Sequence, residues 1–374
     1  MLRLILIIVL FLLSLLTVVR APTSLLWYVS ILVTEFCWIF FTVVLVLLLS
    51  GFGGNRFATV TFLIGIVSLV LYSIPVVGAF RISGSIRASF AKMPNRQQTK
   101  EDPPTPFGLV KMFSGINAKK VSYQTITYDV ANKLTLDFYP SVMAGNKPCV
   151  VIVHGGSWAG GDSQQLPELN SVLAKAGYHV ATINYRLAPK NIYPAPVEDV
   201  KTAIAFLRAN AANLSIDTNN FALLGRSAGG QIVLSAAYTL NDASIKGVIS
   251  FYGPADMVWG YANPTNPLVL NSRKVMEDYL GGTYSEVPQQ YINSSATETI
   301  RPVPTLLIHG ENDPLVSHIH GIRLGKKLDS LGIKYYSLYL PWATHGFDYT
   351  LNGPAGQVST WSVLRFLEGI FTRD

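Results

Sequence analysis

Two patterns of hydrophobic and polar residues divide this chain of 374 residues near position 80. Up to that point the sequence is almost continuously apolar, in three runs over residues 2–19, 25–50 and 57–80. Each run is long enough to cross the roughly 30 Å hydrocarbon core of a bilayer as a helix. The first run could instead be a cleaved secretory signal, but it is long for one and two further runs follow directly. We therefore expect residues 1–80 to be a transmembrane region with three spans.

Glu35 is the one acidic residue within these apolar runs. A carboxylate is costly in hydrocarbon unless it faces another helix or lies near the membrane surface. We expect Glu35 either to have a functional role or to support helix packing.

Beyond residue 120 short apolar runs alternate with amphipathic stretches, a pattern typical of a mostly parallel sheet with helices on both faces. The predicted strands lie at 148–153, 178–184, 221–225, 246–252, 304–309 and 335–340, and the predicted helices at 165–176, 197–212, 229–240, 317–331 and 357–371. Residues 125–139 are expected to add an antiparallel edge hairpin. We expect one α/β domain over residues 121–374, which is ample length for a large core.

Residues 254–300 form a long insertion between two predicted strands and contain many aromatic residues. Such an insertion predicts a cap that lines a substrate pocket, with Trp259 and Tyr261 as candidate lining residues. The alternative is a surface elaboration without a catalytic role.

The charge is distributed unevenly. The net charge is +7, of which residues 81–120 carry +6, whereas residues 121–374 carry −1. A basic cluster next to a predicted span favours anionic lipid headgroups and a cytoplasmic location, and it does not indicate nucleic acid binding by the nearly neutral main domain. We expect residues 81–120 to be a linker, with a proline-rich spacer near its centre. The prediction is an integral, multi-pass membrane protein with its N-terminus outside and its main domain in the cytoplasm.

One pentapeptide lies where a predicted strand is followed by a predicted helix: Gly225-Arg226-Ser227-Ala228-Gly229. In that position, G-x-S-x-G predicts a strained turn that exposes the central serine above the sheet. The glycines are needed because a Cβ atom there would collide with neighbouring backbone. The N-terminus of the following helix favours developing negative charge. Ser227 is therefore the candidate nucleophile.

A glycine-rich loop follows the predicted strand at 148–153. It begins at His154, which we expect to brace the loop, and continues with Gly155 and Gly156. The backbone N–H groups of these two glycines, together with that of Ala228, predict an oxyanion hole.

A serine nucleophile needs a base and an acid that orients the base. On a sheet of this kind the expected order is serine, acid, histidine. Asp313 lies in the loop after the strand at 304–309, and His345 in the loop after the strand at 335–340. Glu311 is a second candidate acid, but the Asp-Pro-Leu-Val sequence that begins at Asp313 favours Asp313.

The other titratable candidates have simpler interpretations. His179 and His309 lie at strand ends, where histidines usually have packing roles. His318 and His320 have the spacing H-x-H, but a third metal ligand is lacking nearby, so we expect no metal. Asp348 is too close in sequence to the candidate base to orient it. We find no nucleotide-binding motif, expect no cofactor, and expect no disulfide from the two cysteines.

These motifs resemble those of α/β-hydrolases of the hormone-sensitive-lipase and acetyl-esterase type, including the feruloyl-esterase-like proteins. The shared motifs, in order, are HGGSW at 154–158, NYRLAP at 184–189, EDV at 198–200, GRSAGG at 225–230, GENDPLV at 310–316 and THGF at 344–347. The resemblance covers about residues 120–374. It implies an α/β-hydrolase fold, a triad of Ser227, Asp313 and His345, and oxyanion donors at Gly155, Gly156 and Ala228.

One position departs from the lipase branch, which often has a third glycine where this chain has Ser157, next to Trp158. The departure favours the esterase-like branch, which also contains arylformamidases, and Trp158 joins the candidate pocket residues.

The sequence therefore predicts a membrane-anchored serine esterase or lipase that acts through an acyl-enzyme. An amide hydrolase of arylformamidase or peptidase type would use the same residues, and a non-catalytic hydrolase-like binding protein is the third hypothesis. The expected partners are the membrane and a small-molecule or lipid ester, and nothing in the sequence indicates an oligomeric state. A chain that begins near Val121 should be soluble and active on short esters.

Overall fold

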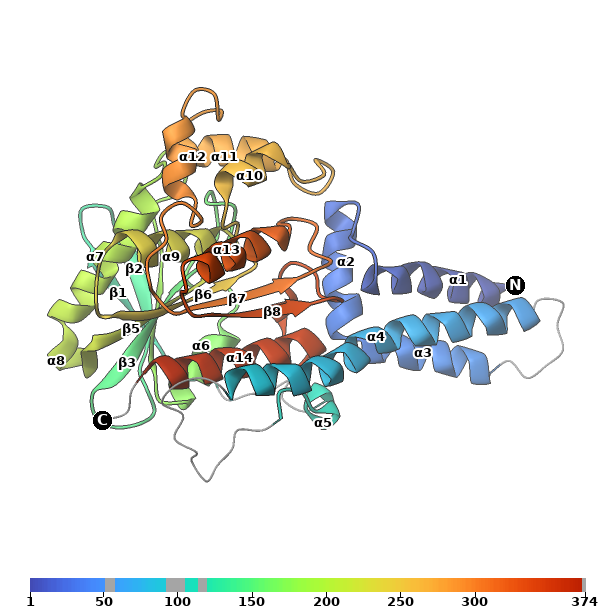
Figure 1. The fold of residues 1–374 in the computed structure, drawn as a ribbon. Helices are drawn as coiled ribbons and strands as arrows, with labels where there is room; N and C mark the ends of the chain where they lie inside the picture. Colours follow the sequence, from blue (N-terminus) through green and yellow to red (C-terminus); the bar gives the residue numbers. More distant parts are fainter. Residues whose placement is uncertain (51–57, 92–104, 114–119, 372–374) are drawn as a thin grey trace.

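The computed structural model describes residues 1–50, 58–91, 105–113 and 120–371. An eight-stranded sheet forms the centre of the main domain, with the strand order β1-β2-β4-β3-β5-β6-β7-β8 (Figure 1). The strands are β1 (Gln124–Asp129), β2 (Leu134–Tyr139), β3 (Lys147–Val153), β4 (His179–Ile183), β5 (Ile216–Arg226), β6 (Ile245–Phe251), β7 (Thr305–Gly310) and β8 (Tyr335–Leu340). The predicted edge hairpin is confirmed as β1 and β2, which pair antiparallel with each other, and β2 pairs antiparallel with β4. Strands β3 to β8 all run parallel to one another.

Helices cover both faces of this sheet, as the alternating pattern predicted. The side chains of β3 alternate between two hydrophobic clusters, one on each face of the sheet. Val151 and Val153 belong to the cluster that includes residues from 195–209, 228–239 and 319–330, whereas Val150 and Ile152 belong to the cluster that includes residues from 168–175 and 354–370. These helices are α6 (Glu168–Lys175), α7 (Ala195–Ala209), α9 (Ala228–Thr239), α13 (Ile319–Ser330) and α14 (Pro354–Ile370), and the short α8 (Ala211–Leu214) follows α7. The sheet is therefore buried on both faces.

The insertion at 254–300 folds as a helical layer beyond the carboxyl ends of the strands (Figure 1). Its helices are α10 (Met257–Ala262), α11 (Ser272–Leu280) and α12 (Pro288–Ser294). Asp256 caps α10 by accepting from the N–H of Trp259, and Asn271 caps α11 by accepting from the N–H of Lys274.

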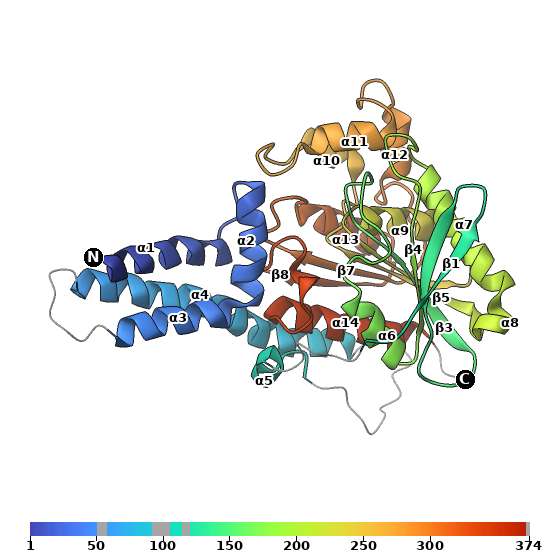
Figure 2. The same ribbon diagram turned by 180° about the vertical axis from the view of Figure 1, so that it is seen from behind.

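The apolar N-terminal region forms a stalk that projects from the main domain (Figures 1 and 2). It consists of α1 (Leu2–Ser14) with the 3₁₀ turn η1 (Leu15–Thr17), α3 (Cys37–Leu49) and the first half of α4 (Ala58–Phe90). These helices pack around Ile7, Val44, Leu48 and Tyr72. Helix α2 (Ser24–Glu35) lies across the base of the stalk, against the main domain.

The chain over 25–50 is not the single straight helix that we predicted. It is two helices, α2 and α3, that meet at an angle of 80° near Phe36. The physical reason is that the polar residues of α2 face the main domain: Glu35 accepts hydrogen bonds from the N–H groups of Ala355 and Gly356, at 3.1 and 3.2 Å. Among the described residues, only Ala58–Phe90 is by itself long and apolar enough to cross a membrane, and α2 with α3 would count as one bent span.

Helix α4 also differs from the prediction, because it continues to Phe90 rather than ending near residue 80. Its second half packs on α14 and the sheet, where Ala79, Ile86 and Phe90 are buried. A Cβ atom on Gly78 would collide with the ring of Trp342, so this glycine permits close packing. Part of the predicted linker at 81–120 is therefore helical; α5 (Leu109–Phe113) lies within it, and 92–104 and 114–119 are outside the described residues.

Candidate active site

Ser227 lies at a strained turn between β5 and α9. Its backbone has φ 52° and ψ −120°, a conformation that residues with side chains rarely adopt. A Cβ atom on Gly225 would collide with the carbonyl oxygen of Gly229, and one on Gly229 would collide with that of Val153. The prediction that both glycines are needed for the turn is therefore confirmed, and the serine is the first residue before the N-terminus of α9.

The structure brings the predicted acid and base together from two neighbouring strand ends. The carboxylate oxygen Oδ2 of Asp313 lies 2.6 Å from Nδ1 of His345. The other oxygen, Oδ1, accepts from the N–H groups of Leu315 and Val316 at 2.8 and 2.9 Å. Burial by itself raises the pKa of Asp313, but the nearby His345 and the hydrogen bonds outweigh burial and hold this pKa well below its usual range. The carboxylate is thus fixed and ionised.

His309 also contacts this carboxylate, a contact that the sequence did not reveal. Its Nε2 lies 3.4 Å from Oδ2 of Asp313 and 2.9 Å from the carbonyl oxygen of Val316. The neighbouring Glu311 is not part of this arrangement; its N–H bonds the carbonyl oxygen of Leu340.

Asp348 has a different role from the orienting acid, as its sequence position suggested. It is buried, pairs with Nε of the buried Arg226 at 2.6 Å, and accepts a hydrogen bond from the hydroxyl of Tyr252. The Tyr252 ring lies 4.3 Å from the ring of His345, so the Arg226–Asp348 pair supports one side of the candidate base.

The glycine-rich loop lies beside the nucleophile. A Cβ atom on Gly155 would stand 3.2 Å from the Cβ of Ser227. However, the N–H of Gly155 donates to the side-chain oxygen of Gln165 at 2.7 Å, so this predicted oxyanion donor is already engaged. Gln165 lies ten residues further along the chain, and no local motif indicated that its side chain would accept this N–H. Gly156 (φ 120°) and Ala228 are the other two predicted donors.

His154 lies at the start of this loop, as expected of a bracing residue. Its Nδ1 lies 2.7 Å from the carbonyl oxygen of Gly155, and its ring stacks on Tyr185 at 4.3 Å. Burial lowers the pKa of His154, which favours the neutral ring.

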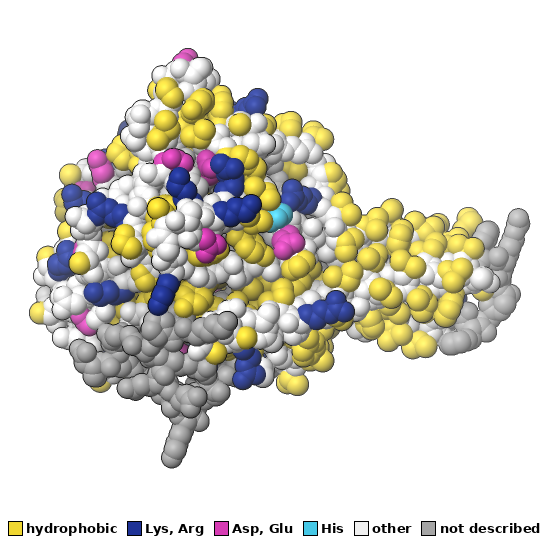
Figure 3. Space-filling model, in the orientation of Figure 1, with side chains coloured by type: hydrophobic (Ala, Val, Ile, Leu, Met, Phe, Trp, Pro, Cys, Tyr) yellow, Lys and Arg dark blue, Asp and Glu magenta, His cyan; other side chains and the backbone are white. Residues whose placement is uncertain are grey.

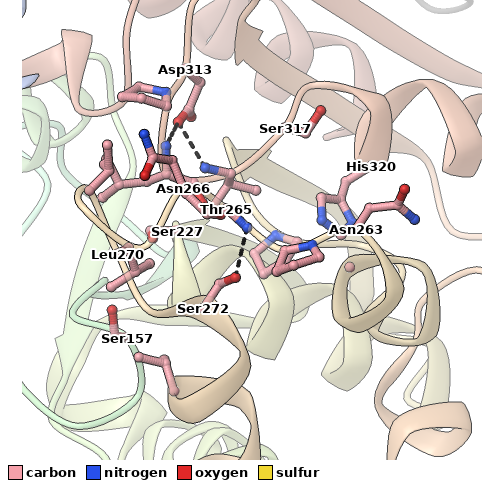
Figure 4. Close-up of a pocket in the computed structure, with 18 of the residues that line it drawn as sticks. Ser157, Ser227, Asn263, Thr265, Asn266, Leu270, Ser272, Asp313, Ser317 and His320 are labelled. Carbon is pink, nitrogen blue, oxygen red and sulfur yellow. Dashed lines mark hydrogen bonds between the residues drawn. The ribbon is translucent and has the colours of Figure 1, made fainter. Parts of the chain in front are cut away.

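A cavity of about 590 Å³ opens beside Ser227 and Asp313 (Figure 4). Trp158 and Trp259 line it, as predicted, whereas Tyr261 does not. The Tyr261 hydroxyl instead bonds Glu277 at 2.7 Å within the helical insertion. The loop at 263–272 of the insertion forms much of the cavity wall, in agreement with the cap interpretation.

The N-terminal region also lines this cavity, a contribution that the sequence did not reveal. Arg20, Ala21 and Pro22, which lie between the first two predicted spans, form part of the wall. In addition, the indole Nε1 of Trp27 donates to the carbonyl oxygen of His345 at 2.8 Å. No sequence signal linked these residues to a loop more than 300 positions away.

The H-x-H pair does not form a joint site. His318 contacts Arg20, whereas Nδ1 of His320 accepts from the N–H of Asp256 at 3.2 Å. Burial lowers the pKa of His320 to about 3, so its ring is neutral. Across the described residues no group of three or more potential metal ligands comes together. Cys37 and Cys149 are both buried and free.

Comparisons with known proteins agree with this geometry. The family model BD-FAE matches residues 136–328. The probable carboxylic ester hydrolase LipM of Mycobacterium tuberculosis is 28% identical over 261 residues, which are 65% of this chain and 59% of LipM. Esterase LipC of the same organism is 29% identical over 244 residues, covering 60% of this chain and 58% of LipC. The chain thus spans less than two thirds of the length of these curated relatives.

Among solved structures, a bacterial heroin esterase superimposes with a TM-score of 0.59 at 23% identity, over 77% of this chain and 98% of the esterase. At this identity the similarity shows the fold alone, which is that of an α/β-hydrolase.

Proposed function

The chain belongs to the BD-FAE family, and from this premise we propose that it is a serine hydrolase of carboxylic esters, anchored to a membrane. The observation that carries the proposal is the 2.6 Å contact between Asp313 and His345, beside a cavity that Ser227 also lines. The esterases among its curated relatives support an ester substrate over an amide.

In the proposed reaction the Ser227 hydroxyl attacks the ester carbonyl while Nε2 of His345 accepts its proton. Asp313 holds the Nδ1–H side of the ring and stabilises the imidazolium. The N–H groups of Gly156 and Ala228 stabilise the oxyanion. The imidazolium then donates its proton to the leaving alcohol, which leaves an acyl-enzyme on Ser227. Water, deprotonated by His345, attacks this ester, and the acid product departs with regeneration of the serine.

Membrane attachment is supported by the surface of the stalk, where apolar side chains cover the visible face (Figure 3). Large exposed apolar residues on its helices include Leu12, Val46, Leu63 and Val70. Such a surface would be a serious liability in water. The N-terminus lies at the far end of the stalk and the hydrolase at the near end (Figure 1), so a stalk inserted in a membrane would place the two on opposite sides, as the proposed topology has them.

Helix α2 supports the same attachment because its outer face carries large apolar side chains. It buries Ser30, Thr34 and Glu35 against the protein and exposes Leu25 and Tyr28, which are 72% and 60% accessible. A helix whose outer face is apolar suits the interfacial region of a bilayer. The substrate cavity, whose wall includes the residues just before α2, would then open close to the membrane surface. A lipid-like ester is therefore the proposed natural substrate.

The test is a panel of p-nitrophenyl esters of graded acyl length, with an anilide and a formylated arylamine, offered to the full-length protein in liposomes. We expect ester hydrolysis, and Ser227→Ala should lower kcat by roughly 10⁴-fold or more and abolish labelling by a fluorophosphonate probe. Equal labelling of wild type and Ser227→Ala would overturn the assignment of the nucleophile. Preference for the anilide or the formylated amine would replace the ester proposal with the amidase alternative.

A further inference from the structure

Helix α2 is attached to the hydrolase at both of its ends. At its start, the N–H of Ser24 donates to the carbonyl oxygen of Leu268 in the loop that lines the cavity, at 3.1 Å. At its end, Oε2 of the buried Glu35 receives the N–H groups of Ala355 and Gly356 at the start of α14. A helix held in this way has a defined position relative to the catalytic loops, although the two flanking helices belong to the stalk.

The middle of α2 lies directly against the loop that carries the catalytic histidine. The indole N–H of Trp27 donates to the backbone carbonyl of His345 at 2.8 Å, and the two rings approach edge to face at 6.1 Å. One turn later, the hydroxyl of Ser30 lies 3.0 Å from that of Thr344. Ile31 covers the next residue of the loop, Gly346, whose φ is 75°.

The contacts made by α2 complete the support of the His345 ring. Asp313 holds Nδ1, and Tyr252 packs against the ring at 4.3 Å. Without Trp27, the carbonyl oxygen of His345 would lose its hydrogen-bond donor and the ring would lose its edge-to-face neighbour. A shift of about 1 Å in a general base can lower a rate roughly 100-fold, because proton transfer requires hydrogen-bond distance.

We propose that α2 is a working part of the active site: Trp27 is a positioning residue for His345, and the segment Arg20–Pro22 completes the substrate cavity. The hydrolase is therefore fully active only with its stalk-connected helix in place. This inference rests on the proposed esterase function, because it assigns a role to contacts with the proposed catalytic base. Because α2 connects two helices of the stalk, the position of the stalk relative to the hydrolase would also affect the rate of the chemical step.

The decisive variant is Trp27→Phe in the full-length protein in liposomes, because it keeps an aromatic ring while it removes the N–H donor and part of the indole. The loss of one partly buried hydrogen bond should lower kcat about three- to tenfold. KM for p-nitrophenyl acetate should change less than about twofold, because Trp27 does not line the cavity. The rate of fluorophosphonate labelling of Ser227 should fall by a similar factor, since that reaction also depends on a correctly placed histidine.

Two further variants separate positioning from general stability. Trp38→Phe, on the neighbouring helix α3 and packed on Phe113, removes another indole N–H and should leave kcat unchanged. Ser30→Ala removes the contact with Thr344 and should lower kcat in the same direction as Trp27→Phe. Membrane insertion and the melting temperature are measured for every variant.

The possible results distinguish this inference from the proposed function. If Ser227→Ala is inactive while Trp27→Phe and Ser30→Ala have wild-type kcat and labelling rates, the positioning role is refuted and the esterase stands. If Trp38→Phe lowers kcat as much as Trp27→Phe, the effect is one of stability and the inference fails. If Ser227→Ala keeps full activity, the proposed function itself is wrong.

Discussion

Removal of residues 1–120 should abolish the activity of this protein rather than release a soluble enzyme. The sequence suggested the opposite, because all the candidate catalytic residues follow Val121. In the structure, however, the second half of α4 is part of the hydrolase core: Phe90 is 4% accessible and stacks on Tyr336 at 5.0 Å. The same ring meets Trp361 edge to face at 5.7 Å.

The cost can be estimated from the side chains that the truncation removes. Loss of a buried phenylalanine side chain such as Phe90 costs about 3–5 kcal/mol, and loss of a buried isoleucine such as Ile86 about 2–5 kcal/mol. These two residues alone contribute about 5–10 kcal/mol, which is comparable with the roughly 5–15 kcal/mol that stabilises a whole domain. The truncation also uncovers Trp342, which is 1% accessible in the full chain and packs on Gly78.

The assay compares residues 121–374 with the full-length protein in detergent, by size-exclusion chromatography, thermal unfolding and hydrolysis of p-nitrophenyl acetate. We expect aggregation or a melting transition lowered by more than about 10 °C, and loss of activity. A chain beginning at residue 58 is the matched control for folding, since it retains α4 and should stay monomeric. Because it lacks α2, its kcat should be lower than that of the full-length protein. A monomeric 121–374 fragment with the full-length kcat/KM would refute this account of the core.

Two further predictions concern the catalytic residues and the strained turn. Asp313→Asn should lower kcat by about 10⁴-fold with the fold retained, because an amide favours the wrong histidine tautomer, whereas Glu311→Gln should have little effect; equal losses in kinetic assays would reassign the orienting acid. Gly229→Ala should lower the melting temperature steeply or prevent folding, since a Cβ would collide with the carbonyl oxygen of Val153. Gly84→Ala, with open space around its Cβ, is the control and should unfold at or slightly above the wild-type temperature; similar unfolding curves for the two variants would contradict this explanation.

The positions of the candidate catalytic residues could be predicted because their signals are local. Ser227 needs a strand, two glycines and a helix within one short segment, and Asp313 and His345 each follow a recognisable apolar strand. The parallel order of β5 to β8 then brings the ends of these strands to one edge of the sheet without further information.

The contributions of distant side chains could not be predicted in the same way. The engagement of the Gly155 N–H by Gln165 depends on how a long loop folds back, and the sequence contains no motif for it. Tyr261 looked like a pocket residue because it is aromatic and lies in the insertion. Its position on α10 instead directs its hydroxyl to Glu277, and the neighbouring Trp259 lines the cavity.

Helix α2 shows why composition alone did not predict the bend within residues 25–50. Leu25, Tyr28 and Leu32 form one exposed stripe, while Thr34 and Glu35 are buried. The apolar composition of a segment does not say on which face of a helix its polar residues lie. It therefore cannot distinguish a helix that crosses a bilayer from one that lies on its surface with polar residues against a protein. The bend at Phe36 goes with this arrangement, because α2 lies across the stalk with Glu35 at the N-terminus of α14, where its carboxylate accepts two backbone N–H groups. Glu35, the carboxylate whose sequence position indicated either a function or a role in helix packing, thus holds the helix that contacts His345, the proposed catalytic base.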